Sequence, residues 1–130
     1  MFHELQILCV AIILGLVHLM IATHLSTKQR GLKWNLSPRD GNPPELTGAA
    51  ARVDRSYKNF METFAFFAAS VLLVHALQKH SQLASIGALV YLVCRVVYIP
   101  IYAMGVIGVR TIIWLISMVG IALILASLFI

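Results

Sequence analysis

The sequence predicts an all-α integral membrane protein, a four-transmembrane-helix up-down bundle. Of the 130 residues, 60% are hydrophobic and 12% are charged, and the mean hydropathy of +0.88 is far too high for a soluble domain of this size. Four apolar segments are each close to the roughly 20 residues that an α-helix needs to cross a bilayer. Because little chain lies outside these segments, residues 1–130 are expected to form a single domain.

The four helices are expected at about residues 3–25, 49–77, 83–103 and 110–130. The first has the position of a secretion signal, but no Lys or Arg precedes it and its apolar run exceeds the roughly 7 to 15 residues of a signal core. We therefore expect it to remain as a helix. The second begins with charged residues and turns apolar from Phe60 onward, whereas the third and fourth are apolar almost throughout.

The long loop at about residues 26–48 is the one extended connection. It carries residues that break helices and favour turns, namely Gly31, Pro38, Gly41, Asn42, Pro43, Pro44 and Gly48. Loops of this length without secondary structure are often functional, and this one is expected to cover the charged start of the second helix. The other two connections are short, so neighbouring helices are expected to be antiparallel.

Positive charge lies almost entirely on one side of the predicted bundle. The first loop, the start of the second helix and the borders of the third loop hold Lys28, Arg30, Lys33, Arg39, Arg52, Arg55, Lys58, Arg95 and Arg110. Only Lys79 is expected on the opposite side. By the positive-inside tendency, the first and third loops are cytoplasmic and both termini are outside. The same bias accounts for the pI of about 9.6, so the basic character does not indicate nucleic-acid binding. The sequence also carries no recognition motif for RNA or DNA.

A polar stripe opens the second helix. Arg52, Arg55, Asn59 and Glu62 stand at spacings of three, four and three, so at about 100° per residue they fall within roughly 80° of one helix face. Such groups are expensive in hydrocarbon and therefore indicate a function. Two guanidiniums, an amide and a carboxylate suit a small zwitterion with several carboxylates. The alternative is structural: Glu62 neutralises one arginine and Asn59 crosslinks helices.

A second stripe lies on the third helix, where Tyr91, Arg95, Tyr98 and Tyr102 follow one another at four, three and four residues. Pro100 is expected to kink the helix beside them. Phenol hydroxyls inside a cleft are suited to donate to a thiolate or to hold a peptide-like ligand. The alternative is that Tyr98 and Tyr102 belong to an interfacial aromatic belt.

Arg110 directly precedes the fourth helix, on the same side as both stripes. An arginine in a partly dry cleft stabilises a developing anion, because Coulomb interactions strengthen as water is excluded. Lowering a thiol pKa from about 8.5 to about 6.5 requires roughly 2.7 kcal/mol of preferential thiolate stabilisation. One well-placed arginine and one hydroxyl are able to supply that. The alternative is a flanking arginine that snorkels to the lipid headgroups.

The sequence predicts no metal site. The histidines are scattered at His3, His18, His24, His75 and His80. They form no Cys/His cluster with metal-ligand spacing, and no pair of acidic residues accompanies them. Glycine-rich phosphate loops and serine nucleophile motifs are also absent from the sequence.

Motifs that carry a family likeness run through nearly the whole chain: Pro43-Pro44-Glu45-Leu46, Arg52-Val53-Asp54-Arg55, Asn59, Glu62, Phe64-Ala65-Phe66-Phe67, and the series Arg95, Tyr98, Tyr102 and Arg110. They resemble the family of membrane-associated proteins in eicosanoid and glutathione metabolism (MAPEG), and most of all its small prokaryotic members, which include proteins similar to microsomal glutathione transferase. The four-helix topology and the long first loop fit the same resemblance.

The resemblance implies a homotrimer in a bacterial inner (plasma) membrane, with glutathione as cosubstrate bound between neighbouring subunits near the cytoplasmic face. It also implies roles for individual residues: Arg110 as the catalytic, thiolate-activating arginine, Arg95 as a possible supporting residue, and, as glutathione-binding residues, Arg52, Arg55, Asn59, Glu62, Tyr98 and Tyr102. The chain departs from the family pattern at Thr63, where some members carry tyrosine, and at Ala65, where proline is frequent. The specialised eicosanoid enzymes are therefore poor templates, and a general conjugating activity is expected.

Three functional hypotheses follow. The first is a metal-free glutathione transferase or peroxidase for detoxification of lipophilic electrophiles or lipid hydroperoxides that arrive from the membrane lipids. The second is a non-catalytic member of the same fold that binds lipids or a partner. The third is a small drug exporter, which needs a titratable carboxylate inside the membrane. Glu4 at a helix end and Glu62 beside two arginines do not suit that task.

Overall fold

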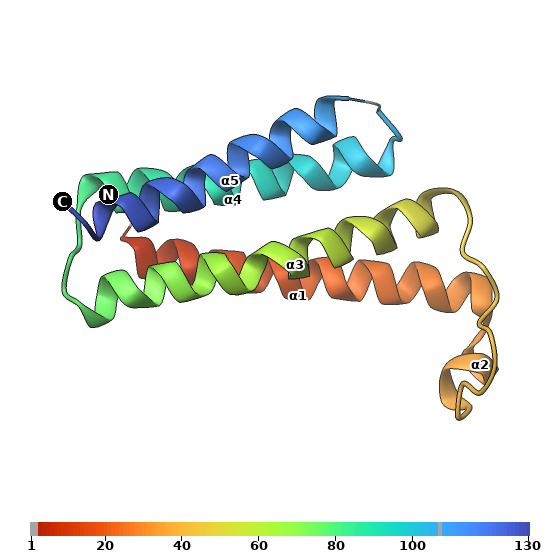
Figure 1. Cartoon of the computed structure of the whole chain (residues 1–130). Coiled ribbons are helices and arrows are strands. Elements are labelled where there is room, and N and C mark those ends of the chain that lie inside the picture. The colour runs from red at the N-terminus through yellow and green to blue at the C-terminus, as the bar shows by residue number, and fades with distance from the viewer. Residues whose placement is uncertain (1–2, 107) are drawn as a thin grey trace.

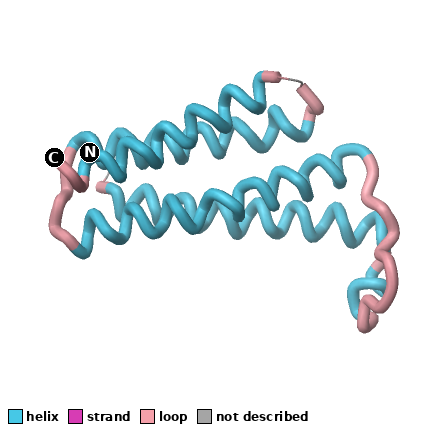
Figure 2. The backbone as a smooth tube through the Cα atoms, viewed as in Figure 1, coloured by secondary structure: helices cyan, strands magenta, loops and turns pink. Residues whose placement is uncertain are grey.

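The computed structural model describes residues 3–106 and 108–130, and its regular elements are all helices (Figures 1 and 2). In chain order they are α1 Glu4–Arg30, α2 Leu32–Leu36, α3 Gly48–Ala76, α4 Gln82–Ala103 and α5 Val109–Ser127. All but α2 are long and apolar enough to cross a membrane. The prediction of an all-α integral membrane protein with four long apolar helices is therefore confirmed.

α1 extends beyond its predicted end near residue 25 and stops at Arg30. Residues 26–30 contain no Gly or Pro, so nothing in them interrupts the helical hydrogen bonds, and Lys28 and Arg30 add positive charge where the helix dipole favours it. The helix ends at Gly31, whose φ of 92° is readily adopted only by glycine. The following loop contains the short α2, where the sequence predicts no secondary structure.

The long loop is tied to the end of α1 by side-chain bonds. The Gln29 amide donates to the Thr47 carbonyl and accepts from the Thr47 backbone N–H, both at 2.9 Å. Arg30 Nε donates to the Pro44 carbonyl at 2.8 Å. Because Thr47 is the N-cap residue of α3, these bonds set where that helix begins beside α1.

The four long helices form two antiparallel pairs, α1 with α3 and α4 with α5, which pack on each other as two layers (Figure 1). The start of α1, the end of α5 and the turn at residues 77–81 lie together, at what we call the terminal end. The long loop and the turn between α4 and α5 lie at the opposite, loop end. The two layers cross at an angle, so that α1 lies nearest to the α4–α5 pair at the terminal end and α3 lies nearest to it at the loop end.

The apolar core lies toward the terminal end. Phe67 of α3 stacks on Tyr91 of α4 with ring centroids 4.1 Å apart, and Thr63 Oγ1 lies 2.9 Å from the Tyr91 hydroxyl. The other buried members of the cluster are Ile7, Leu8, Ala11, Val71, Val74, Ala84, Ala88, Ile121 and Ile124. The apolar cluster therefore fills the half nearer the terminal end, and the half nearer the loop end is where the polar stripes lie.

Polar contacts close the terminal end. The Glu4 carboxylate is 1% exposed, lies 3.0 Å from His80 Nδ1 and accepts from the Ser81 backbone N–H at 3.4 Å. Lys79 Nζ donates to the Leu128 carbonyl at 3.0 Å. These bonds tie the start of α1 and the end of α5 to the α3–α4 turn, so the terminal end is fixed both by packing and by hydrogen bonds.

The α4–α5 pair depends on two glycines that face each other. A Cβ atom added to Gly87 would lie 2.6 Å from the Gly120 carbonyl oxygen. A Cβ atom added to Gly120 would lie 2.7 Å from the Gly87 carbonyl oxygen and 2.9 Å from the Tyr91 backbone nitrogen. Small residues allow helices in a membrane to approach closely and gain dispersion contacts. These two glycines therefore set the separation of α4 and α5.

The outward faces of the helices carry large apolar side chains. Examples are Ile13 of α1 at 60% exposure and Phe66 of α3 at 69%. In water an apolar surface of this extent would drive aggregation. Against lipid tails it is the expected composition of a spanning helix.

We expect Gly120→Ala to destabilise the bundle by about 1–3 kcal/mol, because the added methyl group meets backbone atoms that cannot rotate away. The measurement is the midpoint of unfolding when a denaturing detergent is titrated into the purified protein. Val119→Ala is the control, since Val119 is 54% exposed on the outer face of the same helix and its loss is expected to cost no more than about 0.5 kcal/mol. Equal midpoints for the two variants would contradict the assignment of a close α4–α5 contact.

Candidate functional site

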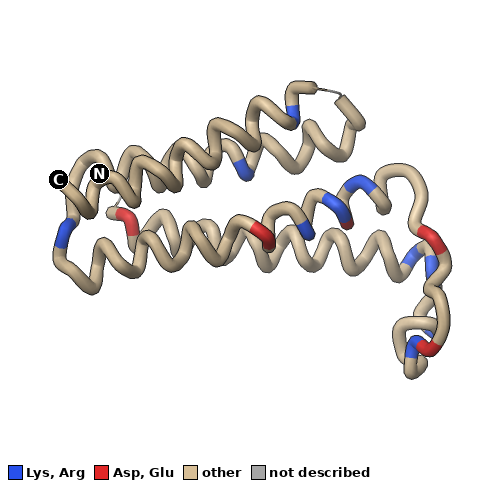
Figure 3. The backbone as a smooth tube through the Cα atoms, viewed as in Figure 1, with Lys and Arg blue, Asp and Glu red and all other residues tan. Residues whose placement is uncertain are grey.

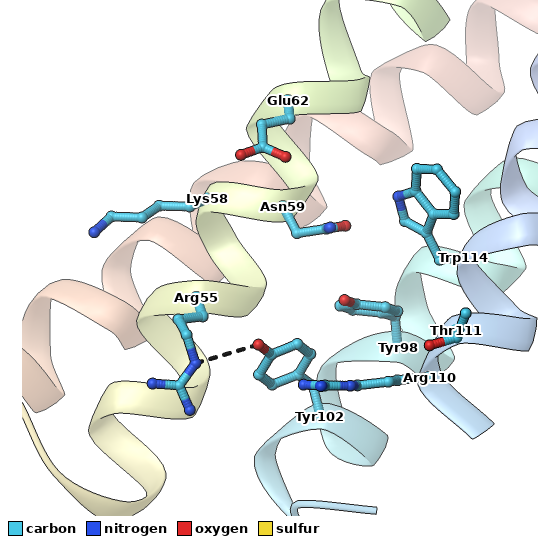
Figure 4. A pocket seen from close by; sticks show the side chains of 9 residues that line it. All are labelled: Arg55, Lys58, Asn59, Glu62, Tyr98, Tyr102, Arg110, Thr111 and Trp114. Atoms are coloured by element: carbon cyan, nitrogen blue, oxygen red, sulfur yellow. Dashed lines mark hydrogen bonds between the residues drawn. The ribbon is translucent and has the colours of Figure 1, made fainter. Parts of the chain in front are cut away.

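A polar cleft of about 470 Å³ lies between α3 and the α4–α5 pair. Its lining residues, drawn in Figure 4, are Arg55, Lys58, Asn59, Glu62, Tyr98, Tyr102, Arg110, Thr111 and Trp114. The volume lies within the roughly 300–1,000 Å³ typical of small-molecule sites. Helical spacing explains the convergence, because Arg55, Asn59 and Glu62 repeat at four and three residues along one face of α3.

Positive charge dominates the cleft. Arg55, Lys58 and Arg110 contribute three cations to the lining, and Glu62 contributes one carboxylate. Figure 3 shows the basic residues of α3 and of the α4–α5 pair toward the loop end. Lys58 Nζ lies 3.0 Å from Asp54 Oδ2, so its charge is partly offset. Arg55 and Arg110 are therefore the cations most available to an anionic ligand.

Tyr102 lies between those two arginines. Arg55 Nε donates to the Tyr102 hydroxyl at 3.2 Å, and the guanidinium carbon of Arg110 lies 4.8 Å from the centroid of the same ring. Because the hydroxyl accepts from Arg55, its proton remains available to a ligand atom in the cleft. Guanidinium packed on an aromatic face is a favourable contact that also holds the side chain in place.

A buried arginine stands behind the cleft wall. Arg95 of α4 is 1% exposed and is not part of the lining. Its Nη1 donates to Asn59 Oδ1 at 2.9 Å, and its guanidinium carbon lies 4.3 Å from the centroid of the Tyr98 ring. Arg95 thus contacts two of the residues that line the cleft.

Arg52 is directed to a different partner. Its Nε donates to the Ala103 carbonyl at 2.8 Å, next to Gly105 in the turn that follows α4. It is half-buried and does not line the cleft. The structure therefore brings together Arg55, Asn59, Glu62, Tyr98, Tyr102 and Arg110, and places Arg52 against the end of α4.

The sequence left open a purely structural role for the polar stripe of α3, in which Glu62 neutralises an arginine and Asn59 crosslinks helices. The structure agrees with the second part of that alternative and not with the first. Within residues 3–106 and 108–130, the ion pairs join Lys58 to Asp54 and His80 to Glu4, so Glu62 pairs with neither Arg52 nor Arg55. Asn59 does crosslink helices, through its bond to Arg95.

The tyrosines of α4 divide between the core and the cleft. Tyr91 belongs to the apolar core, whereas Tyr98 and Tyr102 line the cleft. The shared helix face that the sequence predicts therefore serves two environments, because the apolar cluster reaches only as far as Tyr91 and polar residues of α3 face Tyr98 and Tyr102.

Three lining residues are missed by the sequence analysis. Lys58 enters it only through the charge bias, and Thr111 and Trp114 do not enter it at all. Trp114 lies four residues after Arg110, so the helical spacing that links the other site residues would have placed it on the same face of α5. No cluster of three or more His, Cys, Asp or Glu residues with metal-binding geometry occurs in the described part of the chain.

A second polar cleft, of about 400 Å³, lies between α1, the long loop and α3. It shares Lys58 with the first cleft and is also lined by Arg30, Trp34, Arg39 and Tyr57. The long loop therefore faces the charged start of α3 across a cleft, and polar surface is exposed on both sides of that helix.

The MAPEG family model matches residues 7–130, which is nearly the whole chain. No curated protein and no solved structure matches it.

We expect Arg52→Met to loosen the turn after α4, because the substitution removes a charged hydrogen bond worth about 1.5–3 kcal/mol. Backbone amides of residues 103–106 are expected to exchange with deuterium faster than in the unmodified protein, while those of the core around Phe67 keep their protection. Hydrogen exchange followed by mass spectrometry reports both. Unchanged exchange at residues 103–106 would mean that the contact does not hold the turn.

Proposed function

This chain belongs to the MAPEG family, many members of which are glutathione-dependent enzymes, and on that premise we propose that it is a membrane-bound glutathione transferase or peroxidase. Its substrates are lipophilic electrophiles or lipid hydroperoxides. Family members typically bind glutathione, and we assign to it the cleft between α3 and the α4–α5 pair, with a neighbouring subunit of the proposed trimer covering its open side.

The observation that carries the proposal is the match between cleft and ligand charge. Glutathione carries two carboxylates, one ammonium group and a thiol. The cleft offers Arg55, Lys58 and Arg110 to carboxylates and Glu62 to an ammonium group. A single exposed carboxylate among several cations is an unusual lining for a simple anion site, and it suits a zwitterion with excess negative charge.

The chemical step needs a thiolate. Arg110 is the cation we assign to it, and the hydroxyl of Tyr102, whose ring packs against Arg110, is a second donor. Both stabilise negative charge on sulfur, so the thiol releases its proton to water more easily. In the transferase reaction the sulfur forms a bond to the electrophilic carbon while the leaving group departs with its electron pair. Binding supplies proximity, and the arginine supplies electrostatic stabilisation.

The peroxidase reaction uses the same thiolate. Sulfur attacks a hydroperoxide oxygen, the O–O bond breaks, and the departing alkoxide takes up a proton. A second glutathione thiol then reduces the sulfenic acid formed on the first, which gives glutathione disulfide and water. No metal and no covalent bond to the protein take part in either scheme.

A homotrimer with the first and third loops in the cytoplasm completes the proposal. Two facts support an assembly. Arg55 and Glu62 are exposed within a helix long and apolar enough to span the bilayer, where contact with lipid would be costly. The second polar cleft presents further polar surface on the other side of α3. Contact between subunits would shield both from lipid.

The direct test is calorimetry of the purified protein with glutathione, paired with turnover of a generic halo-aromatic electrophile. Measurable binding and conjugation above the rate in protein-free buffer are expected. Binding without turnover across a panel of electrophiles and a lipid hydroperoxide would favour the non-catalytic alternative. Absence of binding would overturn the proposal.

We expect Arg110→Ala to lower the conjugation rate by roughly 10²–10³-fold, as for removal of a single transition-state donor, with a smaller loss of glutathione affinity. Because removal of the cation raises the pKa of the bound thiol, the rate should also require a higher pH to reach its plateau. Ultraviolet thiolate absorbance of the complex measures that pKa. Arg110→Lys, which keeps the charge, is the matched control. A pH profile unchanged in Arg110→Ala would remove Arg110 from the chemistry.

A further inference from the structure

Arg95 carries a charge that its surroundings do not neutralise. It is 1% exposed, and the ion pairs of residues 3–106 and 108–130 involve other residues. Its Nε and Nη2 atoms are buried and have no hydrogen-bond partner within the described chain. Burial of an unpaired cation is strongly unfavourable, so the contacts that it does make need an explanation.

Those contacts fix the guanidinium from two sides. Its carbon lies 4.3 Å from the Tyr98 ring centroid and 5.7 Å from that of Phe60. The Nη1 atom of Arg95 donates a hydrogen bond to Asn59 Oδ1 at 2.9 Å. Contact with two aromatic rings restrains the plane of the guanidinium and with it the directions of its N–H groups. In this protein the Nη1 group is directed toward the side chain of Asn59.

A donor-only partner decides which way an amide faces. The Asn side chain has an oxygen that accepts and an NH₂ group that donates, and a guanidinium has donors alone. Arg95 therefore holds the Asn59 oxygen against α4 and leaves the NH₂ group for the cleft, which Asn59 also lines. Figure 4 shows Asn59 projecting from α3 toward Tyr98 and Trp114. Without Arg95 the amide is free to rotate and present its oxygen, which would repel an anionic or carbonyl ligand atom.

We propose that Arg95 is a positioning residue, which orients the Asn59 amide so that its NH₂ group donates to a carboxylate or carbonyl oxygen of the ligand in the cleft. This inference rests on the proposed binding of glutathione and adds to it the part of the ligand that Asn59 recognises. Arg95 itself does not touch the ligand. Its effect on binding passes through Asn59.

The test is a double-mutant cycle on glutathione affinity, measured by calorimetry, with Arg95→Met, Asn59→Leu and the double variant. Each single substitution is expected to weaken binding by about tenfold, as for loss of one hydrogen bond to a charged group. In the Asn59→Leu background, Arg95→Met is expected to change the affinity by less than about twofold. Additive effects, or wild-type affinity in a folded Arg95→Met variant, would overturn the inference.

Further arms separate positioning from folding. Arg95→Lys keeps the charge and loses the planar guanidinium, so we expect a rise in KM for glutathione with kcat nearly unchanged. If the Arg95→Met variant does not fold, Arg95→Lys takes its place in the cycle. Lys79→Met is the control for removal of a cation bonded to another helix, because Lys79 contacts Leu128 far from the cleft at the terminal end. Its KM and kcat are expected to equal those of the unmodified protein.

The same measurements distinguish the two levels of the proposal. If the unmodified protein binds no glutathione, the proposed function fails and this inference fails with it. If the unmodified protein binds glutathione and the cycle is additive, the assignment of Arg95 alone is wrong and the proposed function stands.

Discussion

The stacking of Phe67 on Tyr91 divides this bundle into two parts with different tasks. The two rings join α3 to α4 at 4.1 Å, and beyond them toward the terminal end the helices are held by a continuous apolar cluster. Toward the loop end the facing residues are Arg55, Asn59 and Tyr102, which do not pack as a hydrocarbon core. The cleft lies on the loop-end side of this stack, where polar side chains of α3 face Tyr98 and Tyr102 of α4.

Polar groups then link α3 to α4 in the half nearer the loop end. Arg52 bonds to the carbonyl of Ala103 and Arg95 bonds to Asn59, so both link α3 to α4 near the cleft. Arg52 and Arg95 thus have structural contacts, whereas Arg55 and Arg110 line the cleft. In a medium of low dielectric constant each of these charges is costly. A ligand with two carboxylates offsets part of that cost, which is the physical basis of the proposed glutathione site.

Much of the fold and of the candidate site follows from periodicity. Four apolar segments of spanning length predict the four long helices, and spacings of three and four residues predict that Asn59 and Glu62 share a face of α3, as do Tyr98 and Tyr102 of α4. Helix ends were less well predicted. The many turn residues of the long loop led to a predicted end of the first helix near residue 25, whereas α1 continues to Arg30. Trp114 was missed because a tryptophan in an apolar helix looks like an ordinary lipid-facing residue until its neighbours across the cleft are known.

The sequence by itself determined the class of protein, the number of spans and the set of polar residues that must avoid lipid, because these depend on composition and on periodicity within single helices. Only the tertiary structure decided how those residues divide. Contacts between helices distant in sequence direct Arg52 to the end of α4, Arg95 to the amide of Asn59, and Arg55 to the hydroxyl of Tyr102. Spacing within one helix gives the direction of a side chain, but the partner that it meets depends on how the helices pack.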